Sequence, residues 1–212
     1  MIKTAERPGD RTRQFQTTGV ALIEYALSVA DLAGMDAAFP VLSPGAAGAR
    51  ASDFSPTALH KLSTHDGLLE LASLLAGARL RVCRVLGFDK SSGTNWFVPW
   101  HQDRAADGNE RTVAVLEGMV ALRIHLDDCD ENNGPLEVVP GSHTLGRLDR
   151  AALAQVVARQ PPLTCLAARG DIVALRPLLV HRSQRARRPR VRRVLHIEFK
   201  LLGGARAKRS VL

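Results

Sequence analysis

Residues 119–139 read MVALRIHLDDCDENNGPLEVV, and the fold class follows from this stretch. Two β-prone segments, 119–126 and 136–139, lie on either side of an acidic run and an Asn133-Gly134 pair. An Asn-Gly pair favours a tight turn because both residues tolerate positive φ angles. The stretch therefore predicts two strands joined by a turn.

The same pattern extends in both directions from this stretch. Further β-prone segments separated by turn signals lie at 80–87, 95–103, 171–175, 178–183 and 191–201, with one helical interruption at 149–160. Many short strands of this kind predict a sandwich or a jelly-roll barrel. The fold class is therefore mainly β, with helices packed on one face.

The N-terminal third has mostly helical signals. Ser28, with Asp31 three residues later, forms the start signal of a helix that Pro40 ends. Ser55-Pro56 begins a second helical region, which continues through residues 66–75 until Gly77 stops it. These signals predict helices that pack against the β-structure.

We expect one domain that spans residues 1–212. Its mostly helical part is 1–79, its β-barrel core 80–201 and its tail 202–212. Within the first part, residues 20–23 are a strand candidate, and residues 44–55, rich in Gly, Ala and Ser, read as a mobile loop. A chain of 212 residues with 45% hydrophobic and 24% charged residues is typical of one globular domain and excludes a disordered chain.

Charge is concentrated in one place. The net charge is +8, but seven arginines and no acid lie between Arg182 and Arg193, so the rest of the chain is close to neutral. That segment holds no aromatic residue, whereas nucleic-acid binders usually combine basic residues with exposed aromatics. A nucleic-acid partner is therefore disfavoured. A solvated loop with one or two functional arginines and the rim of an anionic-substrate site both remain open.

No segment predicts a membrane or secretory role. Residues 1–16 are polar, and the most apolar candidate, 20–33, is interrupted by Glu24 and Asp31. The three cysteines are scattered and form no CxxC pair, so neither a disulfide framework nor a zinc knuckle is indicated. We expect a protein of the reducing cytoplasm, with no membrane partner.

A set of possible metal ligands stands out in the β-rich part. His101 and Asp103 are two apart, so on a strand they point to the same side. His181 follows an apolar run 78 residues after Asp103 and can supply a second imidazole. Two histidines and one carboxylate on one face leave coordination positions open, as non-haem Fe(II) oxygenases require.

The chain also contains a second histidine-x-aspartate pair, His125 and Asp127. Spacing alone does not separate the two. Trp96 and Trp100 flank the first pair and offer an aromatic pocket wall, whereas Asp127 begins an acidic turn with a solvated character. These local features favour His101 and Asp103.

Four segments together carry a family resemblance: FDKSSGTNWFVPWHQD (88–103), LRIHLDDCDENNGPLEVVPGSH (122–143), GDIVALRPLLVHRS (170–183) and RRVLHIEF (192–199). They resemble the phytanoyl-CoA dioxygenase family of Fe(II)- and 2-oxoglutarate-dependent dioxygenases. The similarity covers residues 85–199. It joins a histidine-x-aspartate pair, a turn with a following strand, and a distal histidine followed by a serine two positions later and an arginine eleven positions later.

The resemblance implies a double-stranded β-helix, the cupin-like jelly roll, with Fe(II) held by His101, Asp103 and His181. It also implies that Ser183 and Arg192 hold the distal carboxylate of the co-substrate, 2-oxoglutarate. Arg193 is the rival anchor, but its neighbours in alternation are apolar, whereas Arg192 shares its side of the strand with polar residues.

This chain departs from the family at three places. Arg182 stands where relatives usually have glycine, which suggests a tighter or more cationic pocket. Arg123 occupies a place where some relatives present a tryptophan near the co-substrate. It is a candidate co-substrate ligand, with a solvent-facing strand arginine as the alternative. In many relatives the connection 104–116 is longer and would form part of a lid over the substrate. Its shortness here leaves open whether such a lid closes.

Four residues are candidate substrate contacts. Trp100 and Gln102 lie next to the predicted metal ligands, and Lys90 and Asn95 precede them and are expected at the pocket mouth. Beyond the metal ligands no further catalytic residue is predicted. The resemblance implies hydroxylation of a small molecule by O2, with release of succinate and CO2. The arginine-rich segment close to His181 favours an anionic substrate. A cupin-like Zn(II) or Mn(II) isomerase or hydrolase and a non-catalytic polyanion-binding β-barrel are the alternatives. The oligomeric state is left open.

Overall fold

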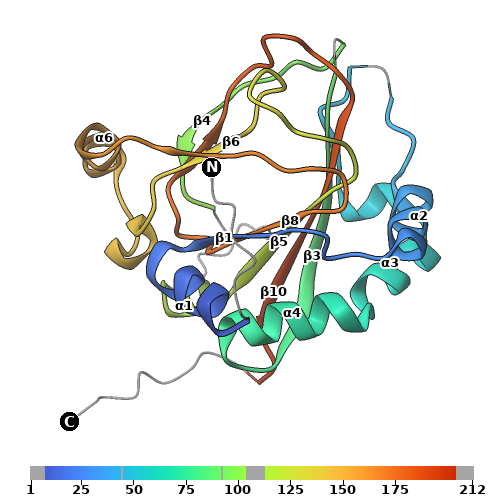
Figure 1. Ribbon diagram of the computed structural model, residues 1–212, viewed down its shortest axis with the longest axis horizontal. Coiled ribbons are helices and arrows are strands. Elements are labelled where there is room, and N and C mark those ends of the chain that lie inside the picture. The colour runs from blue at the N-terminus through green and yellow to red at the C-terminus, as the bar shows by residue number, and fades with distance from the viewer. Residues whose placement is uncertain (1–7, 44, 92, 104–112, 204–212) are drawn as a thin grey trace.

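The computed structural model describes residues 8–43, 45–91, 93–103 and 113–203. Its core is a pair of antiparallel sheets (Figure 1). The six-stranded sheet has the order β1 (Val20–Ile23), β8 (Ile172–Leu175), β5 (Val120–His125), β10 (Arg192–Leu201), β3 (Leu80–Lys90), β2 (Gly48–Ala49). The four-stranded sheet has the order β4 (Val98–His101), β9 (His181–Ser183), β6 (Leu136–Val138), β7 (Leu163–Cys165).

From β3 onward the chain passes repeatedly between the two sheets. β3, β5, β8 and β10 belong to the larger sheet, and β4, β6, β7 and β9 to the smaller. This winding is that of a double-stranded β-helix, so the predicted fold class is confirmed.

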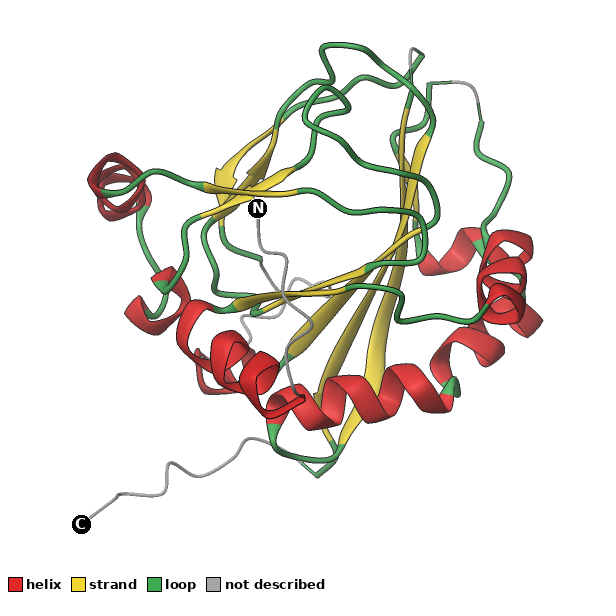
Figure 2. Ribbon diagram, viewed as in Figure 1, coloured by secondary structure: helices red, strands yellow, loops and turns green. Residues whose placement is uncertain are grey.

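Six α-helices are present among the described residues: α1 (Pro8–Thr18), α2 (Val29–Ala38), α3 (Pro56–Ser63), α4 (Asp66–Ala76), α5 (Val113–Glu117) and α6 (Arg150–Arg159), with short 3-10 turns at Ala51–Asp53 and Ser142–Leu145. The helices α1 to α4 cover one face of the larger sheet, whereas α6 lies apart beside the smaller sheet (Figure 2). No helix of the described residues is long and apolar enough to cross a membrane.

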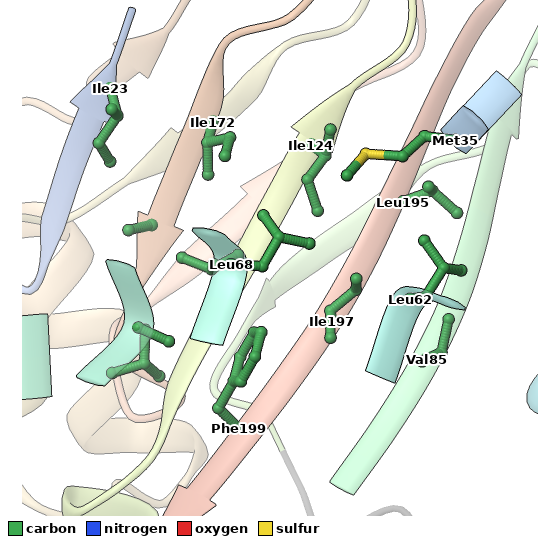
Figure 3. Packing of buried hydrophobic residues seen from close by; sticks show 14 of the residues in the cluster. Ile23, Met35, Leu62, Leu68, Val85, Ile124, Ile172, Leu195, Ile197 and Phe199 are labelled. Carbon is green, nitrogen blue, oxygen red and sulfur yellow. The ribbon is translucent and has the colours of Figure 1, made fainter. Parts of the chain in front are cut away.

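The main hydrophobic core fills the space between these helices and the larger sheet. Leu68 of α4 and Leu62 of α3 pack against Ile124, Leu195 and Ile197 of the sheet (Figure 3). Side chains alternate along a strand. Residues 123 and 125 of β5 and residues 192, 196 and 198 of β10 therefore turn toward the smaller sheet. The core thus orients a row of polar side chains into the barrel.

The start and stop signals of the helices in the sequence agree with the observed ends of α2, α3, α4 and α6. The Ser28 hydroxyl accepts a hydrogen bond from the Asp31 amide at 3.1 Å, and the Asp31 carboxylate accepts one from the Ser28 amide at 3.2 Å. The side chains of Ser55 and Asp149 likewise accept a hydrogen bond from a backbone amide in the first turn of α3 and α6. Gly77 ends α4 at φ 64°, a left-handed conformation that glycine adopts without strain.

Several local predictions are wrong. The sequence analysis missed α1, α5 and β7, and the loop predicted at 44–55 contains β2 and a 3-10 turn. Helix α1 is largely polar and contains the buried Phe15, so it carries no apolar stripe to detect. Strand β9 begins at His181 rather than at 178. Residues 178–180 are a buried turn, and their run of apolar side chains had the pattern of a strand. Residues 104–112 of the predicted short lid lie outside the described residues.

Candidate functional site

A cavity of about 140 Å³ lies between the two sheets. Its lining comes from both sheets and from the loops that join them: Arg84, Phe88, Trp96, Val98, His101, Asp103, Arg123, Leu136, His181, Arg182, Ser183 and His196. The larger sheet contributes mainly cationic and aromatic side chains, and the smaller sheet contributes most of the possible metal ligands.

The predicted ligand set meets at this cavity. His101 and His181 are direct cross-strand partners on β4 and β9, with ring centroids 4.1 Å apart. Asp103 lies just beyond β4, where its backbone amide donates a hydrogen bond to the Pro177 carbonyl at 2.9 Å. One ligand atom from each of the three residues lies within 4.8 Å of the others. Two strands 80 positions apart in the sequence thereby bring three metal-binding groups together.

Backbone carbonyls fix the tautomer of both imidazoles, that is, which ring nitrogen carries the proton. Nδ1 of His101 lies 2.9 Å from the Pro99 carbonyl oxygen, and Nδ1 of His181 lies 2.9 Å from the Leu179 carbonyl oxygen. A carbonyl only accepts hydrogen bonds, so in each neutral ring Nδ1 carries the proton and Nε2 keeps its lone pair. Both Nε2 atoms face Asp103 Oδ1, at 3.8 and 3.7 Å. The arrangement presents electron-pair donors from three side chains.

Burial of His181 and the histidines around Asp103 favour the protonation states that a metal needs. Desolvation lowers the pKa of His181 to about 4, so its ring is neutral near pH 7. For Asp103 desolvation alone raises the pKa, but His181, His196 and His101 together hold it below its ordinary value. Oδ2 of Asp103 is buried and has no hydrogen-bond partner among the described residues. An anionic carboxylate without a partner, facing two lone pairs, is the environment that a divalent cation satisfies.

The second histidine-x-aspartate pair is placed differently. His125 is 4% exposed, and desolvation lowers its pKa to about 3. Asp127 accepts hydrogen bonds from the Arg193 guanidinium at 2.8 and 2.9 Å. His125 and Asp127 belong to neither of the groups of possible metal ligands found among the described residues. The acidic turn therefore holds an arginine rather than a metal site.

Ser183 is among the residues that line the cavity and Arg192 is not, but both side chains bond to the carbonyl of Gly134. Arg192 Nη1 donates a hydrogen bond to this oxygen at 2.7 Å, and the Ser183 hydroxyl donates another at 3.1 Å. Arg192 is 1% exposed, and its Nε and Nη2 have no hydrogen-bond partner among the described residues. Two unsatisfied N–H directions of a buried guanidinium form a site for a carboxylate.

Gly134 permits this close packing. It adopts φ +63°, and a Cβ at this position would lie 2.6 Å from the Gln184 carbonyl oxygen and 2.9 Å from Lys90 Nζ. We expect Gly134→Ala to lower the free energy of unfolding by about 1–3 kcal/mol. Alanine is strained in the left-handed conformation, and its Cβ would be too close to the Gln184 carbonyl oxygen. Urea denaturation measures this change, with Gly45→Ala as the control. Gly45 has φ +82° but no atom within 4 Å of such a Cβ, so an equal loss in both variants would refute the steric contribution.

Arg193 lies on the other side of β10. Its guanidinium binds Asp127 and approaches Asp36 of α2 at 3.2 Å. The strand alternation that distinguished Arg192 from Arg193 in the sequence therefore agrees with their placement. Arg193 ties the helical layer to the sheet, and its charge is already paired.

Arg123 points into the barrel and lines the cavity. It is 7% exposed, and its guanidinium carbon lies 5.1 Å from the centroid of the Phe88 ring. Desolvation and the nearby Arg192 lower its pKa to about 10, so Arg123 remains a cation near pH 7. The solvent-facing alternative for this arginine is wrong.

Arg182, which replaces the usual glycine, does not add a free charge to the cavity. Its guanidinium donates to the Glu137 carboxylate at 2.6 Å and lies 4.6 Å from the centroid of the Trp100 ring. The expected cationic effect is thus largely cancelled by Glu137. Trp96, rather than the predicted Trp100, is the tryptophan among the cavity-lining residues.

Three of the predicted substrate contacts are engaged with the chain itself. The Gln102 amide donates to the carbonyls of Gly146 and Leu178 and accepts from the Leu148 amide, so it anchors loops. Asn95 exchanges two hydrogen bonds with the backbone of Ala186. Lys90 is fully buried beside Ser183 instead of facing the pocket mouth. These placements correct the sequence prediction, which had no means of seeing the backbone partners.

Strand alternation in the sequence placed His196 and Glu198 on the polar side of β10 with Arg192, but it did not indicate that they lie next to Asp103. Asp103, His196 and Glu198 form a second group of ligand-type atoms within 4.8 Å of one another. Glu198 is also 2.7 Å from the Arg84 guanidinium, so its charge is compensated by a cation of the protein. The strand alternation that predicts an inward-facing Arg192 also predicts that His196 and Glu198 face inward.

Similarity to known proteins agrees with this geometry. A family model described as phytanoyl-CoA dioxygenase (PhyH) matches residues 57–194. An L-proline trans-4-hydroxylase of Streptomyces griseoviridis is 42% identical over 60 residues, which is 28% of this chain and 21% of the hydroxylase. The match to this relative therefore spans about a fifth of its length.

Solved structures match over most of the chain. AviO1 from Streptomyces viridochromogenes Tue57 superposes with a TM-score of 0.74 at 25% identity, over 97% of this chain and 99% of AviO1. EctD from S. alaskensis, solved with 2-oxoglutarate and 5-hydroxyectoine, superposes with a TM-score of 0.73 at 19% identity, over 94% of this chain and 79% of EctD. The second likeness concerns the fold alone.

Proposed function

This chain belongs to the phytanoyl-CoA dioxygenase (PhyH) family of non-haem iron, 2-oxoglutarate-dependent dioxygenases, and from that premise we propose that it hydroxylates a small anionic molecule with release of succinate and CO2. His101, Asp103 and His181 hold the ferrous ion in this proposal. Arg192 and Ser183 hold the distal carboxylate of 2-oxoglutarate, and Arg123 contacts the co-substrate closer to the metal.

The observation that carries the proposal is the convergence of two imidazole lone pairs on one carboxylate. Both Nε2 atoms lie 3.7–3.8 Å from Asp103 Oδ1, and Asp103 Oδ2 is buried without a partner among the described residues. A lone pair on Nε2 that faces a carboxylate oxygen gains nothing unless a cation lies between the two atoms. Two histidines and one carboxylate on one face also leave positions open for the co-substrate and O2.

The charge of the cavity wall supports a dianionic co-substrate. Arg123 and Arg192 are buried cations that form no ion pair with a described residue, and Arg84 is paired with Glu198. A dianion bound between the metal and Arg192 compensates these charges. The guanidinium offers two parallel N–H groups to a carboxylate, and Ser183 adds a hydroxyl at the same end.

The iron centre, when bound, supplies activation of O2 coupled to oxidative decarboxylation of 2-oxoglutarate. The chain positions the reactants. Arg192 and Ser183 fix the distal end of the co-substrate, so that its oxo-acid end faces His101, Asp103 and His181. Leu136, Val98 and Phe88 form apolar walls that exclude water from the cavity. No side chain is required as a general base, because the chemistry belongs to the cofactor and co-substrate.

Hydroxylation as the reaction type is supported by one relative, the proline hydroxylase that matches over 60 residues. The anionic character of the substrate rests on arginines after His181 that remain exposed: Arg185, Arg187 and Arg188. Arg190 is paired with Asp130, and Arg182 with Glu137, so only part of the basic segment is available to a ligand. We place the reaction in the cytoplasm, in keeping with three cysteines that form no disulfide among the described residues.

Anaerobic titration of the protein with Fe(II) and then 2-oxoglutarate tests the proposal. We expect a weak visible charge-transfer band that needs both additions and saturates at one equivalent of each. On exposure to O2, a panel of small carboxylates, phosphates and thioesters, matched with neutral analogues, is screened for stimulated succinate release. A Zn(II) or Mn(II) isomerase or hydrolase would form no succinate. A polyanion-binding barrel would show neither the band nor succinate and would lose heparin retention when Arg185, Arg187 and Arg188 are replaced together.

A further inference from the structure

Gln102 stands between two of the proposed metal ligands, His101 and Asp103. Both ligands line the cavity and Gln102 does not, as the alternation of side chains along an extended segment predicts. Gln102 is 8% exposed, and its amide forms three hydrogen bonds with the backbone of other segments. A buried amide with this many partners holds its own backbone in one position.

Strand pairing gives this segment little support. In the part of the chain that the structure describes, β4 is an edge strand, and its pairing with β9 is irregular between Val98 and His101. The strand ends at His101, so Gln102 and Asp103 follow it outside the ladder, where the Asp103 amide donates to the Pro177 carbonyl at 2.9 Å. A carboxylate ligand just beyond an irregular strand end needs a further restraint to keep its position.

The turn before His181 supplies that restraint. Gln102 Nε2 donates a hydrogen bond to the Leu178 carbonyl at 2.7 Å. The next carbonyl along the chain, that of Leu179, lies 2.9 Å from Nδ1 of His181 and sets the orientation of its ring. The same short turn therefore holds the first ligand segment through Gln102 and the distal imidazole through its own backbone.

The other two hydrogen bonds of Gln102 reach the connection between β6 and α6. Nε2 donates to the Gly146 carbonyl at 2.8 Å, and Oε1 accepts from the Leu148 amide at 2.8 Å. This connection is itself fixed to the turn, because the buried Ser142 hydroxyl accepts a hydrogen bond from the Val180 amide at 2.8 Å. Gln102 thus joins β4, the turn before β9 and the segment that leads into α6.

The three ligands have no mutual attraction that could replace these ties. In their metal-binding tautomers, the Nε2 lone pairs of His101 and His181 face Asp103 Oδ1 at 3.8 and 3.7 Å, and electron pairs repel. Any free energy spent on bringing the ligands together is lost from the affinity for a cation. A restraint that keeps them in place therefore raises that affinity.

We infer that Gln102 is a positioning residue of the metal site, whose amide ties the segment of His101 and Asp103 to the turn that orients His181. The inference rests on the proposed function, because it concerns the ligands of the same site. It makes metal affinity and coordination geometry depend on a side chain outside the cavity. A glutamine that only stabilised loops would change the melting temperature and leave both properties unchanged.

Gln102→Met tests this role, because methionine has about the length of glutamine but lacks the two amide donors. We expect the dissociation constant for Fe(II), measured by anaerobic equilibrium dialysis, to rise about 10–100-fold, as for other partners that orient metal ligands. Co(II) serves as a spectroscopic probe of the same site. Its visible bands are expected to change in position and intensity, because they report the arrangement of the ligands. Melting temperatures show whether the variant is folded.

Gln16→Met is the matched control. The Gln16 amide also ties segments together, since it donates to the Leu75 carbonyl at 2.6 Å and accepts from Arg176 Nη2 at 2.8 Å, but these residues are not among those that line the cavity. A lower melting temperature with unchanged Fe(II) affinity and an unchanged Co(II) spectrum is expected.

Gln102→Asn is the second test variant, for use even if Gln102→Met does not fold. It keeps the amide on a side chain that is one carbon shorter and cannot reach Gly146, Leu148 and Leu178 together. The loss of part of the hydrogen bonds is expected to raise the dissociation constant for Fe(II) at least about fivefold.

The outcomes are distinct. Unchanged Fe(II) affinity in a folded Gln102→Met or Gln102→Asn overturns the role of Gln102 and leaves the proposed function standing. A Co(II) spectrum identical to that of the wild type overturns it as well, because the ligands would then be in place without the amide. An equal loss of affinity in Gln16→Met also counts against it, since the effect would follow general stability. Failure of the wild type to bind either metal refutes the proposed function itself.

Discussion

Replacing His101 with alanine is expected to abolish tight binding of Fe(II), with the dissociation constant raised by more than about 100-fold. Loss of a mere orienting partner of a metal ligand costs 10–100-fold, and loss of the ligand itself costs more. His101 supplies one of two lone pairs that face Asp103, and no other histidine of the described residues joins that group. Anaerobic equilibrium dialysis with Fe(II) measures the constant directly.

His125→Ala is the matched control for this experiment. It removes the histidine of the other histidine-x-aspartate pair, which is buried but lies outside the ligand group. Fe(II) affinity is expected to stay within a few-fold of the wild type, with some loss of stability. If His125→Ala abolished metal binding and His101→Ala did not, the metal site would belong to the second pair.

Arg192→Ala is expected to raise the Michaelis constant for 2-oxoglutarate at least tenfold and up to about 150-fold. A hydrogen bond to a charged group is worth about 1.5–3 kcal/mol, and this guanidinium offers two unsatisfied N–H directions. The turnover number at saturating co-substrate should fall less, because the metal ligands are untouched. Initial rates of succinate release at several 2-oxoglutarate concentrations separate the two constants.

Arg193→Ala and Arg192→Lys complete this test. Arg193 is already bound to Asp127 and Asp36, so its removal is expected to lower stability and leave the Michaelis constant unchanged. Arg192→Lys keeps the charge but loses the planar pair of donors, so an intermediate constant is expected. An unchanged constant in Arg192→Ala, with impairment in Arg193→Ala, would move the anchor by one residue.

The double-stranded β-helix explains why these two effects are separable. The proposed metal ligands His101 and His181 belong to β4 and β9 of the smaller sheet, whereas Arg192 belongs to β10 of the larger one. In the proposed function, co-substrate bound between them links the two sheets. Its two ends meet different strands, and each variant removes the contact at one end.

Local chemistry alone determined much of this description. The capping pair Ser28 and Asp31 and the stop at Gly77 depend on interactions within a few residues, so the sequence predicts them. The tight turn predicted at Asn133-Gly134 is wrong as a link between paired strands, because β5 and β6 belong to different sheets and only Gly134 has a positive φ. Strand alternation likewise indicated that Arg192 faces inward and Arg193 outward. The same reasoning failed for α1, which carries no apolar stripe, and for β7, whose three residues are too few to show a pattern.

Only the tertiary structure decided which histidine-x-aspartate pair meets His181, and that Gln102 and Asn95 serve the backbone. Equal spacing makes His101 and His125 equivalent in the sequence. They differ because β4 pairs with β9, whereas β5 pairs with β8 and β10. Strand pairing joins residues far apart along the chain, and no local propensity encodes the neighbours of a side chain.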